Sequence, residues 1–160
     1  MNAKLTFSAP AILAAYEAAV NKGLGLVVLK MQIELRKMLN RKGSGRVYRG
    51  GLAGKGMYRQ RSAGGEPPSP DTGTLRNSAQ TARSIVTTDK GKSITHTMFG
   101  FRVGIDQSVT LPLLLERGSS RMAARPFVAP TIDIVRPMAV QIIDEQLEIC
   151  SRSLRTQGAL

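Results

Sequence analysis

Between residues 66 and 76 the chain reads Glu66-Pro67-Pro68-Ser69-Pro70-Asp71-Thr72-Gly73-Thr74-Leu75-Arg76. The three prolines restrict φ and disfavour helix at the residue before each of them, so this segment begins extended. The Asp71-Thr72-Gly73 step favours a sharp turn, because an aspartate side chain can bond its own backbone and glycine accepts positive φ. The sequence before this turn predicts a helix and a basic loop, and the sequence after it predicts strands and a closing helix. An ordinary proline-rich linker is the alternative interpretation.

The composition indicates one soluble domain. A chain of 160 residues that is 42% hydrophobic is long enough for one core, and its net charge of +12 attracts polyanions. Cys150 is the only cysteine and there is no Cys/His cluster, so we expect no disulfide, no metal and no cofactor. The chain has neither a signal-peptide pattern nor an uninterrupted apolar run of about 20 residues, so we expect no membrane segment.

The first 40 residues predict an N-terminal arm and a long helix. Ser8 and Pro10 are typical of a helix start. Apolar residues then recur every three or four positions, namely Ile12, Tyr16, Val20, Leu24, Val27, Met31, Leu35 and Met38. Gly23 and Gly25 each cost about 1 kcal/mol relative to alanine in a helix. One helix with a weak middle is therefore favoured over two helices.

Residues 41–61 carry seven cations and no acid. The cations are Arg41, Lys42, Arg46, Arg49, Lys55, Arg59 and Arg61. Because glycines between them raise the entropic cost of ordering, we expect residues 41–70 to form a flexible basic loop. Such a loop orders against an acidic protein neighbour or, with Tyr48 and Tyr58 available for stacking, contacts nucleic acid.

The region after the turn predicts a small antiparallel sheet. Residues 82–87 and 95–105 have strand character, and residues 89–92 suit a hairpin turn. Residues 111–117 predict a short helix that ends at Gly118, a residue suited to a left-handed cap.

A C-terminal helix over residues 129–154 closes the chain, and Pro137 predicts that its regular part starts near Arg136 or kinks there. The fold class is therefore α+β, with a small antiparallel sheet packed by the two long helices in a single domain of residues 1–160. Its parts are residues 1–40, 41–70, 71–128 and 129–154.

No catalytic pattern is present in the sequence. Asp144, Glu145 and Glu148 lie on the polar side of the closing helix with no histidine or cysteine beside them. The glycines of the basic loop do not have the spacing of a phosphate-binding loop. We therefore expect a protein that is not an enzyme.

Two motifs occur in order along the chain. The first is Pro67-Pro68-x-x-Asp71-Thr72-Gly73-x-Leu75-Arg76, and the second is Glu116-Arg117-Gly118-Ser119 followed by Ala124-Arg125-Pro126-Phe127. Over residues 9–151 this arrangement resembles the neck or tail-completion proteins of long-tailed double-stranded-DNA bacteriophages and prophages. The chain departs from that family at Leu113-Leu114-Leu115, where an aromatic and a small residue are usual, and in its long basic loop.

The resemblance implies a structural virion protein that assembles in the host cytoplasm as a homo-oligomeric ring. At the head-tail junction this ring joins the head-completion proteins, of adaptor or stopper type, to the tail tube protein, and double-stranded DNA passes through its lumen. The motif residues are expected to make structural or subunit contacts, and they are Asp71, Thr72, Gly73, Leu75, Arg76, Glu116, Gly118, Arg125, Pro126 and Phe127. The seven cations of residues 41–61 are expected to contact DNA or a protein partner.

The motif residues also have an interpretation from their chemistry. Arg125 is extended because it precedes Pro126, so its guanidinium can be aimed at Glu116, and Phe127 fills the junction with the closing helix. Arg76 is left free beside the turn. These charges either stabilise the fold or join subunits. The rival function is a stand-alone basic nucleic-acid-binding protein, although no known binding module is recognisable in the sequence.

Overall fold

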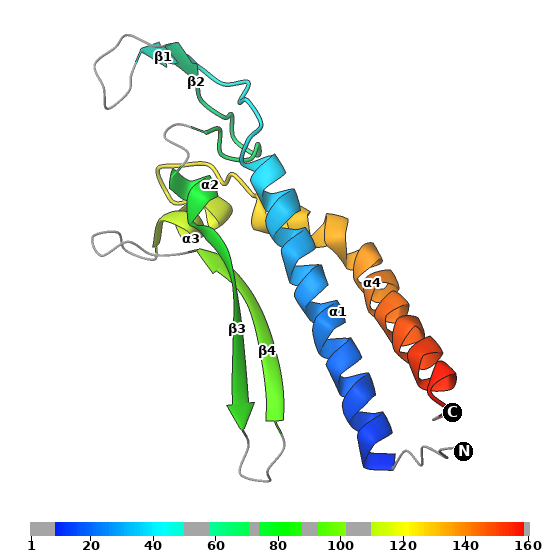
Figure 1. The fold of residues 1–160 in the computed structure, drawn as a ribbon. Helices are drawn as coiled ribbons and strands as arrows, with labels where there is room; N and C mark the ends of the chain where they lie inside the picture. Colours follow the sequence, from blue (N-terminus) through cyan, green and yellow to red (C-terminus); the bar gives the residue numbers. More distant parts are fainter. Residues whose placement is uncertain (1–8, 50–57, 71–73, 88–92, 102–109, 159–160) are drawn as a thin grey trace.

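The computed structural model describes residues 9–49, 58–70, 74–87, 93–101 and 110–158. Its two long helices are α1 (Ala9–Met38) and α4 (Val128–Thr156). Between them lie β1 (Val47–Arg49), β2 (Tyr58–Gln60), α2 (Thr74–Ser78), β3 (Ala79–Thr87), β4 (Ser93–Phe101) and α3 (Thr110–Arg117). The predicted long helices at the two ends of the chain are confirmed, and they lie side by side in Figure 1.

Helix α1 is continuous for 30 residues, a length of about 45 Å. The glycines do not interrupt it. Gly23 is buried against α4, where a Cβ atom would lie 3.2 Å from the Cα atom of Ile143. The small residue thus lets the two helix backbones approach, and the packing that it permits offsets its poor helix propensity.

Helix α4 begins eight residues before Arg136 and runs through Pro137, so the predicted helix over residues 129–154 is confirmed. Of the two alternatives at Pro137, a regular start near Arg136 is wrong. A proline in a helix leaves the carbonyl four residues earlier without its usual partner. Here that carbonyl belongs to Asp133. Because Asp133 and Pro137 are both exposed, it can accept a hydrogen bond from water.

The strands form two separate antiparallel ladders. Strands β3 and β4 make a hairpin in which Ala79 pairs with Phe101 and Thr87 with Ser93, whereas β1 pairs only with β2. Helix α1 contacts both strands of the hairpin and also α4, so it lies between them (Figure 1). Residues 102–105, the end of the second predicted strand, lie outside the described part of the chain.

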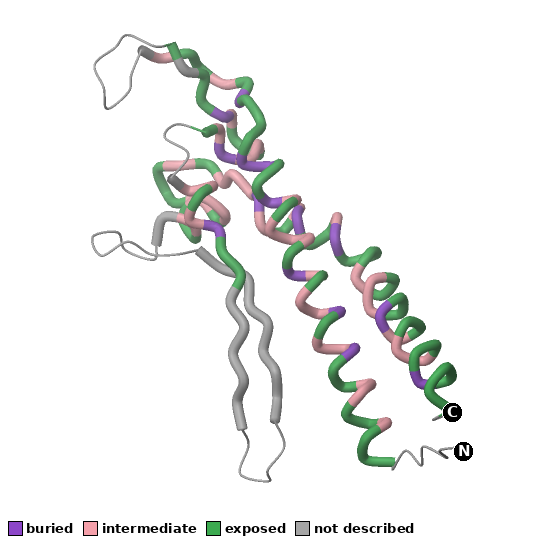
Figure 2. The backbone as a smooth tube through the Cα atoms, in the orientation of Figure 1, coloured by how far each residue is buried: buried purple, intermediate pink, exposed green. Residues whose placement is uncertain are grey.

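The main core cluster lies where the C-terminal end of α1 meets the start of β3 and of α4. It consists of Leu35, Leu39, Ala79 and Phe127, with Leu75, Leu115 and Val128 packed against it. Gln32 and Arg36 of α1 both donate to the carbonyl oxygen of Ala79, at 2.9 and 3.3 Å, and so hold β3 against the helix. Away from this cluster much of the outer surface of both long helices is exposed (Figure 2).

Candidate functional site

Part of the basic segment folds into a two-stranded ribbon, β1 and β2, at the end of the molecule away from the termini (Figure 1). Tyr48 pairs with Arg59, and the Arg61 N–H donates to the Arg46 carbonyl at 3.2 Å, which extends the ladder by one pair. Cross-strand partners share a face and so do alternate residues of a strand, so Arg46, Tyr48 and Arg61 belong to one face. The Arg61 guanidinium lies 4.4 Å from the centroid of the Tyr48 ring, within cation–π distance. The sequence analysis missed this ribbon, because three-residue strands leave almost no periodic signal.

The seven predicted contact cations occupy different parts of this segment. Arg41 and Lys42 follow α1, Arg46 and Arg61 close the ribbon at its base, Arg49 and Arg59 lie in the strands, and Lys55 lies outside the described residues. Within the described part of the chain, no acid forms an ion pair with Arg41, Lys42, Arg46 or Arg61. Their charges are therefore not neutralised by any acid in the described part of the chain.

The base of the ribbon depends on two glycines. The Gly45 N–H donates to the Arg61 carbonyl at 2.8 Å. A Cβ atom at Gly43 would overlap that carbonyl, and one at Gly45 would lie 2.9 Å from the same oxygen. Only glycine at these positions allows the two backbones to approach so closely.

Glu66 holds the two sides of this base together. Its carboxylate accepts hydrogen bonds from the Ser44 hydroxyl, from the Ser44 N–H at 2.9 Å and from the Ala63 N–H at 2.9 Å. These donors, the Ser44 hydroxyl first among them, lower the pKa of Glu66 to about 2. Glu66 is the only acid among residues 41–70, and its oxygens are engaged by these donors rather than by the arginines of the ribbon.

The proline-rich segment connects the ribbon to the core. The Ser69 hydroxyl donates to the Gln60 carbonyl at 2.9 Å, and Leu75 packs against the core cluster. Arg76 was expected to be free, but its Nη1 donates to Oδ1 of Asn40 at 2.6 Å, so it ties α2 to the end of α1. The predicted turn residues Asp71, Thr72 and Gly73 lie outside the described part of the chain.

The second motif builds the start of α4. The Glu116 carboxylate accepts from the backbone N–H groups of Phe127, Val128 and Ala129, at 2.8, 2.9 and 2.9 Å. The next residue, Pro130, has no N–H. Glu116 therefore satisfies every backbone donor at the N-terminus of this helix, where Phe127 has no polar side chain to act as a cap.

The expected ion pair between Arg125 and Glu116 is therefore wrong. Both Glu116 oxygens face backbone donors, and the Arg125 backbone N–H donates to the Leu115 carbonyl at 2.7 Å. The Arg125 Nε atom is buried and finds no hydrogen-bond partner among the described residues. Gly118 takes a φ of +77° and donates to the Leu114 carbonyl at 2.8 Å, which gives α3 the left-handed cap that its position predicts.

Helix α1 also presents an uncovered apolar surface. Leu26, Leu29 and Ile33 are exposed and follow one another at spacings of three and four, so they form one stripe, named here the α1 stripe. By length and composition alone α1 could cross a membrane, and only 17% of its most apolar 18-residue window is buried.

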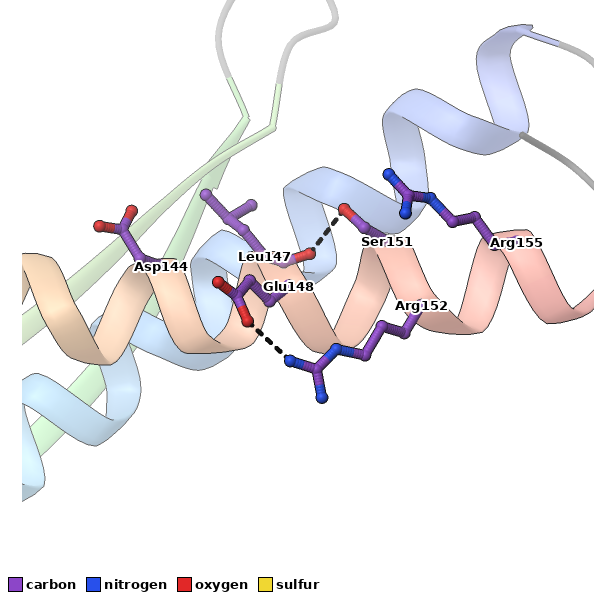
Figure 3. Close-up of a pocket in the computed structure, with 6 residues that line it drawn as sticks. All are labelled: Asp144, Leu147, Glu148, Ser151, Arg152 and Arg155. Carbon is purple, nitrogen blue, oxygen red and sulfur yellow. Dashed lines mark hydrogen bonds and ion pairs between the residues drawn. The ribbon is translucent and has the colours of Figure 1, made fainter.

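One hollow lies along α4 beside α1, lined by Asp144, Leu147, Glu148, Ser151, Arg152 and Arg155 (Figure 3). Three of its polar side chains have partners: the Ser151 hydroxyl donates to the Leu147 carbonyl and bonds the Tyr16 hydroxyl, both at 3.0 Å, and Arg152 pairs with Glu148 at 2.8 Å. No histidine is among the described residues that line this hollow. Among the residues that the structure describes, no three His, Cys, Asp or Glu side chains gather as metal ligands.

Comparisons with protein-family models, curated proteins and solved structures find no match to this chain.

Proposed function

We propose that this chain is a subunit of a homo-oligomeric ring in the head-tail connector of a long-tailed bacteriophage. There it joins head-completion proteins to the tail tube and lets DNA pass. The two motifs support the proposal, and the observation that carries it is the α1 stripe, in which Leu26, Leu29 and Ile33 are exposed on an otherwise packed helix. An exposed apolar patch on a folded chain marks a surface that binds a partner.

A closed ring requires two different complementary patches on each subunit. We assign one to the α1 stripe. The other is the edge of the β3–β4 hairpin, which pairs with no further strand among the described residues. Pairing between the hairpins of adjacent subunits would extend the antiparallel ladder from one subunit to the next.

A membrane is the other apolar partner that α1 could meet. Glu17 and Lys22 lie within the apolar part of the helix, and Tyr16 bonds Ser151 of α4. Charged side chains at the centre of a bilayer cost about 2.5–3.5 kcal/mol each. These features favour a protein partner for α1 over lipid.

Sedimentation velocity and electron microscopy of the purified protein test this function. We expect rings, formed by the chain alone or after addition of tail tube or head-completion protein. Leu29→Glu introduces a charge into the α1 stripe and is expected to weaken each contact by about 2 kcal/mol or more, about 30-fold. The control is Leu13→Glu, an exposed position about 160° around the helix from Leu29, which is expected to assemble normally.

Two results would contradict the ring, and a third would contradict the role of the α1 stripe in it. A monomer under all these conditions that binds duplex DNA tightly favours the stand-alone nucleic-acid-binding protein. Recovery of the protein with phospholipid vesicles favours a membrane role for α1. Equal assembly of the Leu29 and Leu13 variants removes the α1 stripe from the interface.

A further inference from the structure

We propose that the β1–β2 ribbon binds the phosphate backbone of duplex DNA without reading its sequence. This surface differs from the α1 stripe and the hairpin edge, so the inference can fail while the ring holds, and the reverse.

The first support is uncompensated charge. Residues 41–61 contribute seven cations and no acid, and the acid nearest to them along the sequence, Glu66, accepts hydrogen bonds from Ser44 and Ala63. Arginines that serve only to stabilise a fold are usually paired with carboxylates, and Arg46 and Arg61 are paired with none in the described part of the chain. Such a surface binds a polyanion favourably, because each cation that neutralises a phosphate releases a counterion.

The second support is preorganisation. The base of the ribbon is held by the close backbone approach at Gly43 and Gly45 and by the Glu66 hydrogen bonds, so its arginines are presented on a defined scaffold. Stacking on the Tyr48 ring restricts the Arg61 side chain. Ordering these groups before binding lowers the entropic cost of forming contacts.

The third support is shape. Figure 1 shows the ribbon projecting beyond the helices at one end of the molecule, so a long ligand can reach it without meeting the body of the subunit. A two-stranded ribbon fits the major groove of B-form DNA, whereas the major groove of A-form RNA is too deep and narrow for side chains to read. The phosphate chemistry is common to both nucleic acids, and the groove geometry selects DNA.

Fluorescence anisotropy with a labelled duplex of about 20 base pairs, titrated at several salt concentrations, tests the proposal. The variant Arg46→Gln/Arg61→Gln is compared with Lys22→Gln/Arg155→Gln, which removes the same charge from exposed positions outside the ribbon. Each lost phosphate contact lowers affinity about 8-fold at about 0.1 M salt, so the ribbon variant is expected to bind about 60-fold more weakly. Its salt slope should fall by about 2, while the control slope stays unchanged.

Two further measurements distinguish the possible causes of weaker DNA binding. Arg46→Lys/Arg61→Lys keeps both charges and is expected to keep the salt slope; a slope as low as that of the Gln variant assigns the loss to ribbon structure and overturns phosphate binding. Duplex RNA is expected to bind more weakly than DNA, and equal binding overturns the choice of DNA.

The remaining outcomes also overturn the proposal. Equal losses in the ribbon and control variants would mean general attraction to a basic protein. Unchanged DNA binding by the ribbon variant, together with failed ring assembly, would mean that the ribbon contacts a protein neighbour. Sedimentation of the same variants reports the ring separately.

Discussion

Replacement of Glu116 by glutamine is the most direct test of how this fold is held together. The carboxylate accepts three backbone N–H groups at the start of α4, at 2.8, 2.9 and 2.9 Å. The glutamine amide keeps one acceptor oxygen, and its NH₂ group faces at least one backbone N–H that then lacks an acceptor. The substitution also removes the negative charge from the N-terminus of α4. A hydrogen bond to a charged group contributes about 1.5–3 kcal/mol, and the helix dipole adds about 0.3–1 kcal/mol. We expect Glu116→Gln to lower the free energy of unfolding by about 2–3 kcal/mol.

Urea unfolding followed by far-ultraviolet circular dichroism measures this loss, at one fixed protein concentration because assembly would add to apparent stability. For a chain of this size the thermal midpoint should fall by about 4–12 °C. The matched control is Glu148→Gln, which makes the same chemical change on an exposed surface pair with Arg152. That pair contributes no more than about 0.5 kcal/mol. If Glu116→Gln and Glu148→Gln differ by less than about 0.5 kcal/mol, Glu116 does not cap α4 and the reasoning is refuted.

Four glycine variants test the backbone packing and conformation, and one titration tests the charge at the ribbon base. Gly25→Ala should stabilise the chain by about 1 kcal/mol in urea unfolding, because nothing lies within 4 Å of the new methyl group, whereas Gly23→Ala should lose that gain against α4; equal gains would contradict close packing there. Gly65 and Gly118 both have positive φ, but only Gly118 is crowded by backbone, so alanine should cost about 1 kcal/mol at Gly65 and clearly more at Gly118 in thermal melts, and the reverse order would be inconsistent with the structure. Because the pKa of Glu66 is lowered from 4.5 to about 2, its stabilisation should be complete above pH 4.5 and lost as the pH falls through about 2. NMR titration of the carboxyl group checks this, and a midpoint near 4.5 would show that the hydrogen bonds are not formed.

The sequence alone was sufficient to predict the two long helices and the excess of positive charge in residues 41–61. Apolar spacing extends over eight turns in residues 9–38 and over a similar length in the closing helix, so the periodic signal is strong. The positions of the two motifs and the absence of acids in residues 41–61 are likewise properties of the sequence. These features depend only on residues close together in the chain.

Only the tertiary structure showed which groups Glu116, Gly23 and the β1–β2 ribbon contact. Glu116 was paired with Arg125 because opposite charges attract, but folding brings the Glu116 carboxylate to three backbone N–H groups at the start of α4. Gly23 looked like a weak point until the approach of α4 gave it a packing role. The β1–β2 ribbon depends on contacts between segments on either side of residues 50–57, and short strands carry little local preference of their own. Local preference is set by neighbours in the chain, whereas the partner of a charge, a glycine or a strand is set by which distant segments the fold brings within a few ångströms.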